Sequence, residues 1–270
     1  MFHLHQLIND IIEKTTARIS DSETREKNVS ESIAPKRSIL DAIATARKKQ
    51  KVAVISEVKP SSPREKIKDV TPSDAAAIAK TMEEAGATAI SVLTEPHYFN
   101  GSKENLKKVR KEVTIPVLRK DFIIDERQIE ECENDIILLI AAILREKLPS
   151  FVETALSKGI EPLVEIHNLE DLEFAFQSQA RLLGINNRDL NTLEVDIGTT
   201  EKLLPYIKTH EKENNRTYFV VSESGIGNPE DARRMINAGA DALLVGTSIM
   251  KGDIYDNTKA IVTSLEGGIK

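Results

Sequence analysis

Apolar residues follow one pattern in the first fifty residues of the chain and another pattern in the rest. In the first part they recur three or four positions apart, as on one face of a helix, at Leu4, Leu7, Ile8, Ile11 and Ile12 and again within residues 38–47. From Lys51 onward, short apolar runs alternate with polar turns and with further stretches of helical spacing. The pattern predicts an N-terminal helical extension, residues 1–50, packed on one alternating domain, residues 51–270.

The alternating region contains eight short apolar runs that are typical of buried parallel strands, because apolar residues follow one another with little polar interruption. These runs cover residues 52–58, 89–93, 116–119, 136–140, 162–166, 182–185, 219–222 and 242–245. The stretches that predict helices cover residues 72–85, 102–112, 126–133, 149–158, 169–177, 199–212, 229–238 and 256–265. The third of these helices is short, since it leads almost directly into the next apolar run.

Alternating strands and helices without a low-complexity linker predict an α/β fold, a single (β/α)8 TIM barrel. A repeated segment supports this prediction: Glu84-Ala-Gly-Ala-Thr-Ala-Ile and Asn237-Ala-Gly-Ala-Asp-Ala-Leu both join a helix to a strand. A doubly wound open sheet is the alternative architecture. It is disfavoured because no Gly-x-Gly-x-x-Gly motif follows the first apolar run.

The last two strand–helix units indicate a binding site for phosphate. Asn228 and Pro229 begin a helix that Gly239 ends, and glycine-bearing turns follow the two flanking apolar runs, at residues 224–227 and 246–248. Backbone N–H groups in such turns bind anions, and barrels often hold phosphate after their last two strands. The alternative is that these glycines only form tight turns. Their place at the end of the series favours a phosphorylated small molecule as ligand.

The composition limits the classes of protein to which the chain can belong. Its 270 residues are 40% hydrophobic and 30% charged, which is enough to bury a full core and fits one barrel or two smaller domains. A net charge of −6, scattered Lys and Arg, 4% aromatic residues and no Trp argue against a surface that binds nucleic acid or a membrane. No segment is apolar for long enough to span a bilayer, and the first ten residues lack the features of a secretory signal, so we expect a cytoplasmic protein.

Cysteine and histidine positions favour neither a disulfide nor a metal centre. The single Cys132 excludes an internal disulfide and a thiolate metal cluster, and its acidic neighbours would not lower its pKa. His3 and His5 are two positions apart, a spacing that a helix does not bring together. We interpret Cys132 as structural and expect no metal at the N-terminus.

Charged and polar residues occur where several of the predicted strands end, which is where reacting groups project in a barrel. Side chains alternate along a strand, so Ile55, Glu57 and Lys59 share one face. Four further strands end with Lys120, with Glu165, with Asn186 and Arg188, and with Glu223 and Ser224. A solvated rim is the alternative for any one of them, but charges that converge on one barrel mouth are costly unless they pair or meet a ligand. Paired ammonium and carboxylate groups can act as general acid and base. We interpret His167, one step past its strand, as a loop residue.

Six segments at the strand ends resemble the motifs of indole-3-glycerol phosphate synthase. They are Ser56-Glu-Val-Lys-Pro-Ser-Ser-Pro63, Ser91-Val-Leu-Thr-Glu95, Pro116-Val-Leu-Arg-Lys-Asp-Phe122, Leu163-Val-Glu-Ile-His167, Gly184-Ile-Asn-Asn-Arg-Asp189 and Val221-Ser-Glu-Ser-Gly-Ile226. The two-helix extension is also similar to that of the family. The resemblance implies a TIM barrel that converts 1-(2-carboxyphenylamino)-1-deoxyribulose 5-phosphate into indole-3-glycerol phosphate, with loss of carbon dioxide and water, in tryptophan biosynthesis. It implies no metal and no organic cofactor.

The resemblance also implies roles for individual residues. Lys120 would be the general acid that protonates the ribulose carbonyl oxygen, and Glu165 would be the general base. Lys59 would assist the loss of a hydroxyl group as water, and Glu57 would hold Lys59. Asn186, Glu223 and Ser224 would position the substrate, Arg188 would pair with an anionic group, and Ser62, Gly225, Gly246 and Thr247 would bind the phosphate.

Two other functions are weighed against the synthase. A related sugar-phosphate barrel, phosphoribosylanthranilate isomerase, works with a cysteine and aspartate pair, but Cys132 is not at a strand end. A non-catalytic or engineered scaffold would have no reason to keep the charges of Lys120 and Glu165. One departure from the family follows Pro63, where the chain reads Arg64-Glu-Lys-Ile-Lys instead of a small residue and glycine. We expect a monomer that acts on a phosphorylated small molecule.

Overall fold

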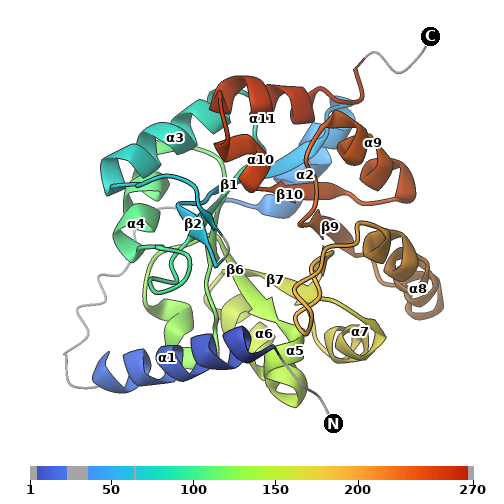
Figure 1. Cartoon of the computed structure of the whole chain (residues 1–270). Coiled ribbons are helices and arrows are strands. Elements are labelled where there is room, and N and C mark those ends of the chain that lie inside the picture. The colour runs from blue at the N-terminus through green and yellow to red at the C-terminus, as the bar shows by residue number, and fades with distance from the viewer. Residues whose placement is uncertain (1–4, 23–35, 64, 267–270) are drawn as a thin grey trace.

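Parallel strands form a closed barrel in the computed structural model, which describes residues 5–22, 36–63 and 65–266 (Figure 1). The barrel strands are β1 (Ala53–Val58), β4 (Ala89–Leu93), β5 (Val117–Lys120), β6 (Ile136–Ile140), β7 (Glu161–Ile166), β8 (Leu182–Asn186), β9 (Phe219–Glu223) and β10 (Ala242–Val245). All eight predicted strands are present, with ends that differ by one residue at most, so the predicted TIM barrel is confirmed. The expectations on His3, Leu4 and Arg64 lie outside the described residues.

Helices that follow the strands pack around the outside of the barrel (Figure 1). They are α3 (Pro72–Glu84), α4 (Lys103–Glu112), α6 (Leu148–Ser157), α7 (Leu169–Phe176), α8 (Gly198–Asn214), α9 (Pro229–Ala238) and α11 (Ile254–Val262). The predicted signals for α9 are confirmed, because the side chain of Asn228 accepts from two backbone N–H groups and Gly239 ends the helix with a φ of 112°. None of the described helices is long and apolar enough to cross a lipid bilayer.

Several short elements differ from the prediction. The helix expected at 126–133 is a 3-10 helix, η1 (Glu126–Glu130), because the buried Arg119 donates to the carbonyl of Gln128, and the Gln128 side chain accepts from the N–H groups of Ile124 and Asp125. These contacts hold the backbone of the segment in a tight turn. The elements that were not predicted are β2 (Ser61–Ser62), β3 (Glu65–Lys66), α5 (Ala141–Leu144), η2 (Arg145–Lys147) and α10 (Thr247–Met250).

The two helices of the N-terminal extension lie at opposite ends of the barrel. Helix α2 (Ile39–Lys48) covers the end where the strands begin: Ile39 and Ile43 pack with apolar side chains inside the barrel, and Arg47 pairs with Asp241 just before β10. Helix α1 (Gln6–Ser22) lies at the other end, where Arg18 pairs with Asp121 just after β5 at 3.1 Å. Figure 1 shows α1 in dark blue in front of the barrel and α2 in paler blue behind it. One end is therefore sealed by apolar packing, and the other carries the site.

Candidate active site

Strand β1 ends in a carboxylate that lies between two lysines. Glu57 points into the barrel, as the alternation of side chains predicted, and is 2% exposed. Its Oε1 is 3.3 Å from Nζ of Lys59, and its Oε2 is 3.6 Å from Nζ of Lys120 at the end of β5. Burial alone would raise the pKa of Glu57, but the two ammonium groups outweigh burial and lower that pKa. Glu57 is therefore charged and can orient both lysines.

Lys120 also pairs with Glu223 at the end of β9, at 3.0 Å between Nζ and Oε2. Burial would lower the pKa of Lys120, but Glu223, Glu57 and Glu165 outweigh it and raise the pKa well above its ordinary value. Burial raises the pKa of Glu223, and although Lys120 opposes the rise, the charges of Glu165 and Glu57 add to it. Lys120 is thus held protonated, and Glu223 is the carboxyl group of the cluster that most readily keeps a proton.

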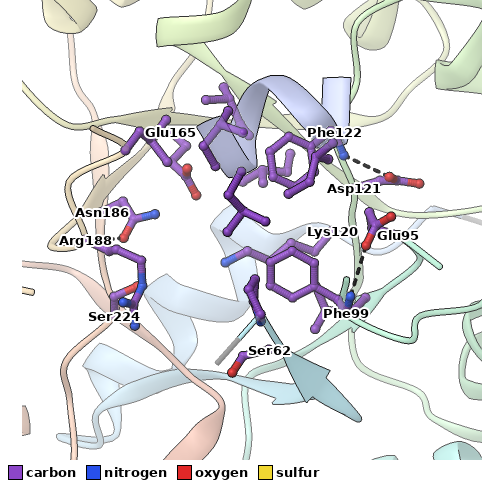
Figure 2. Close-up of a pocket in the computed structure, with 18 of the residues that line it drawn as sticks. Ser62, Glu95, Phe99, Lys120, Asp121, Phe122, Glu165, Asn186, Arg188 and Ser224 are labelled. Atoms are coloured by element: carbon purple, nitrogen blue, oxygen red, sulfur yellow. Dashed lines mark hydrogen bonds between the residues drawn. The ribbon is translucent and has the colours of Figure 1, made fainter. Parts of the chain in front are cut away.

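Glu165, near the end of β7, reaches toward the centre of the same site from across Lys120 (Figure 2). Its Oε1 is 3.3 Å from Nε2 of His167, and the Nδ1 of His167 is 3.1 Å from Oδ2 of Asp171. Burial would raise the pKa of Glu165, but His167 and then Lys120 outweigh burial and hold that pKa below its usual range. The cluster therefore combines a charged carboxylate with a protonated amine, the pairing that general acid–base chemistry needs.

The sequence analysis did not find the environment of His167. The backbone of His167 does follow the end of β7, as predicted, but its side chain is only 4% exposed and lies between two carboxylates. A signal was present, because residues two positions apart share one face of a strand and Glu165 and His167 are so spaced. Asp171 lies four positions further on, in the first turn of α7, where Asn168 caps the helix.

Two glycines at inward-facing positions make room for these carboxylates. A Cβ atom at Gly184, in β8, would lie 2.1 Å from Oε1 of Glu223, and a Cβ atom at Gly246, just after β10, would lie 2.6 Å from Oε1 of Glu57. Both distances are shorter than any real contact of a Cβ atom allows. Gly246 was predicted as a phosphate contact, but its missing side chain also provides the space that Glu57 occupies.

Most of the predicted site residues border one cavity at the open end of the barrel (Figure 2). The cavity brings together eight of them: Glu57, Lys59, Ser62, Lys120, Glu165, Asn186, Arg188 and Ser224. Apolar side chains line another part of the wall, among them Leu7, Ile8 and Ile11 of α1 and the rings of Phe99 and Phe122, whose centroids are 6.3 Å apart. Helix α1 therefore contributes directly to the cavity, which the sequence analysis did not predict.

Four predicted residues do not line this cavity. Glu223 is fully buried behind it, Gly225 and Gly246 lie in the turns that follow β9 and β10, and Thr247 begins α10. The two turns are joined, because the hydroxyl of Ser248 donates to the carbonyl of Ile226 at 3.0 Å. Gly225 has a φ of 80°, and a Cβ atom there would lie 2.7 Å from two side chains, so the first turn requires glycine.

The described residues contain no group of three or more His, Cys, Asp or Glu side chains arranged to hold a metal ion. Cys132 is a free thiol that packs against the outer core, and burial raises the pKa of that thiol. A raised pKa agrees with the interpretation of Cys132 as structural, since the thiolate is the reactive form.

Comparisons with known proteins identify the family of the chain. A family model described as indole-3-glycerol phosphate synthase matches residues 6–263. The indole-3-glycerol phosphate synthase of Halobacterium salinarum is 40% identical over 92% of this chain and 93% of its own length. That of Caldanaerobacter subterraneus is 44% identical over 82% of this chain and 84% of its own length.

Among solved structures, the N-acetylmannosamine-6-phosphate 2-epimerase from Clostridium perfringens is similar, with a TM-score of 0.57 and 16% sequence identity. The similarity covers 82% of this chain and 94% of that chain, and at this identity it shows the fold alone. The sequence relatives and the family model show the family as well as the fold. The chain belongs to the indole-3-glycerol phosphate synthase family, carboxy-lyases of tryptophan biosynthesis.

Proposed function

We propose that this chain converts 1-(2-carboxyphenylamino)-1-deoxyribulose 5-phosphate into indole-3-glycerol phosphate, and that Lys120 and Glu165 transfer the protons in two separate steps. The observation that carries the proposal is the convergence of Lys59, Lys120, Glu57 and Glu165 on one cavity in a chain of this family. Two ammonium groups and two charged carboxylates at one cavity supply both acids and bases without a further group.

Lys120 is assigned to ring closure. As the aromatic carbon that bears the carboxylate attacks the ribulose carbonyl, a carbon–carbon bond forms and the electrons of the C=O double bond move to oxygen, which takes a proton from Lys120. Carbon dioxide then leaves, and its bonding electrons restore the aromatic ring. An ammonium group fixed in place by Glu57 and Glu223 is already oriented toward the developing charge, and such preorganised donors contribute several kcal/mol to transition-state stabilisation.

Glu165 and Lys59 are assigned to the dehydration that follows. The hydroxyl group formed from the carbonyl leaves as water with a proton from Lys59, and Glu165 accepts the proton that the new ring loses as it becomes indole. Glu57 lies 3.3 Å from Lys59 and so holds this second acid in place. Because Lys59 follows β1 and Glu165 lies on β7, the acid and the base can act on opposite sides of the same ring.

The two ends of the substrate are assigned to different parts of the site. We assign its phosphate to Gly225, Gly246 and Thr247, whose segments are joined by the hydrogen bond of Ser248, and to Ser62 in β2. Asn186 and Ser224, which line the cavity, then position the hydroxyl groups, and Glu223 contributes from behind the wall by holding Lys120. Arg188 pairs with an anionic group of the substrate. The apolar wall with Phe99 and Phe122 suits the aromatic ring.

The test is an assay of the purified chain with the carboxyphenylamino substrate, in which indole fluorescence and released carbon dioxide are measured. We expect both products from the wild type, and roughly a hundredfold lower rate from Lys120→Met, given the usual size of general-acid contributions. Lys107→Met, which removes an exposed lysine on α4, is the matched control and should behave as the wild type.

Borohydride added during turnover separates proton transfer from covalent catalysis. A lysine that formed a Schiff base with the ketose would be trapped as a stable adduct, whereas a proton donor leaves no substrate-derived mass on the protein. A folded wild type that releases neither product contradicts the proposed activity. An adduct on Lys120, or full activity in Lys120→Met, contradicts the proposed role of that residue.

A further inference from the structure

His167 and Asp171 form a buried chain of contacts that ends on Glu165 and that no step of the proposed reaction uses. The side chains of Glu165, His167 and Asp171 are 3%, 4% and 1% exposed. Asp171 is fixed in place, because its Oδ2 accepts from the backbone N–H of His167 at 2.8 Å and its own N–H donates to the capping side chain of Asn168 at 2.9 Å. The aspartate in turn fixes Nδ1 of the imidazole, which turns Nε2 toward Glu165.

We propose that His167, oriented by Asp171, is a positioning residue that keeps the Glu165 carboxylate charged and directed into the cavity. This inference rests on the proposed function, because it assumes that Glu165 is the base. The arrangement is the one by which a carboxylate and an imidazole orient a third group at reacting centres. A buried ion pair adds little to stability when apolar side chains could fill the same volume, so its presence beside the cavity points to a use in the chemistry.

The charges that face Glu165 from other strands explain why such a residue is needed. Lys120 approaches from β5, whereas Glu57 on β1 and Glu223 on β9 add negative charge to the cluster. Like charges that share one site repel, so the carboxyl groups of the cluster do not hold a proton equally readily. The imidazole of His167 lies beside Glu165, so Glu223 holds a proton more readily than Glu165, which stays free to accept one from the substrate.

The protonation of His167 agrees with this geometry. Burial would lower the pKa of the imidazole, but Asp171 and Glu165 outweigh burial and raise the pKa to about 9. His167 is therefore charged at neutral pH, with Nδ1 in hydrogen-bond contact with Asp171 and Nε2 3.3 Å from the Glu165 carboxylate. Since the interaction is mutual, the charge of Glu165 must raise the pKa of His167 by as much as the charge of His167 lowers the pKa of Glu165.

The first test is the pH dependence of kcat/KM in His167→Gln, which removes the charge and keeps a polar side chain. An opposite charge at this distance lowers a carboxyl pKa by about one to three units, so the acid limb of the profile should move up by that amount. His97→Gln, at an exposed histidine, is the matched control and should keep the wild-type profile. A purely structural role would reduce kcat without moving the limb, and a fall in kcat with an unmoved limb overturns the proposal.

The second test needs neither substrate nor a folded His167 variant. NMR titration of the histidine ring signals should show one residue with a midpoint near pH 9 in the wild type, and Glu165→Gln should lower that midpoint by one unit or more. A His167 signal that titrates near 6.5 in the wild type, or one that Glu165→Gln leaves unchanged, overturns the pairing. Because no turnover is measured, this result holds or fails independently of the proposed activity.

Discussion

Replacing Gly184 by alanine places a methyl group where the carboxylate of Glu223 now lies. The new Cβ atom would be 2.1 Å from Oε1 of Glu223 and 3.2 Å from Cδ1 of Leu163, whereas ordinary contacts begin at 3.4 Å. The carboxylate must therefore retreat by about 1.3 Å, the difference between 3.4 and 2.1 Å. The ion pair of Glu223 with Lys120, now 3.0 Å long, cannot keep its geometry after such a movement.

The expected effect is on the chemistry more than on binding or folding. Misplacement of a reacting group by about 1 Å can cost roughly a hundredfold in rate, so kcat of Gly184→Ala should fall by about ten- to a hundredfold. KM should change little, because Glu223 lies behind the cavity wall and not on it. Overpacking at such a site costs about 1–3 kcal/mol of unfolding free energy, which still leaves a folded protein.

Steady-state kinetics and urea unfolding of Gly184→Ala check this prediction. Ser157→Ala is the control, because this small exposed residue ends α6 on the outside of the barrel and does not line the cavity. The control should keep the wild-type kcat. If Gly184→Ala also stays within about twofold of the wild type, the carboxylate of Glu223 has no strict place in the reaction and the reasoning fails.

Two further predictions follow from the same cluster. Gly246→Ala places a Cβ atom 2.6 Å from Oε1 of Glu57, so kcat should fall as well as affinity for the substrate; a rise in KM alone would show that Gly246 serves only the phosphate. The pKa of His167 rises from 6.5 in the unfolded chain to about 9 in the folded protein. The charged imidazole therefore stabilises the folded protein fully below pH 6.5, and this contribution is lost as the pH rises toward 9. Urea unfolding between these pH values should show that loss in the wild type and a much smaller one in His167→Gln; equal losses in both would contradict it.

The barrel could be predicted because its strands are buried on both faces. Residues 136–140, for example, are apolar throughout. A continuous apolar run this short, between two stretches of helical spacing, is typical of a strand that is covered on both faces. The ends of the helix at residues 229–238 were equally clear, since Asn228 precedes a proline at the first helical position and Gly239 follows the last turn. Local physical chemistry thus determines most of this fold.

The elements that were missed carry no such local signal. Strands β2 and β3 are two residues long, polar and partly or fully exposed, and they are held by pairing with each other. The 3-10 form of η1 depends on Arg119, which reaches it from β5. Contacts made by side chains distant in the sequence decide such segments, and hydrophobic periodicity does not record them.

The features of the site, like those of the fold, divide into ones that the sequence predicts and ones that it does not. Glu57, Lys120 and Glu165 could be predicted because a charged side chain at the end of a buried strand is excluded from the apolar core and points into the barrel mouth. The pairing of Lys120 with Glu223, by contrast, depends on the space that Gly184 leaves, which becomes visible only when β8 and β9 are side by side. Likewise, the contribution of α1 to the cavity wall depends on how the extension docks.

The central claim is that Lys120 and Glu165 serve different steps, and single-turnover mixing with carbon dioxide and indole followed in parallel tests it most directly. Lys120→Met should delay both signals together, because ring closure precedes both. Glu165→Gln, which keeps the shape of the side chain but cannot accept a proton, should release carbon dioxide at nearly the wild-type rate while indole appears late. If Glu165→Gln delays both signals equally and Lys120→Met leaves carbon dioxide release untouched, the division of roles is wrong.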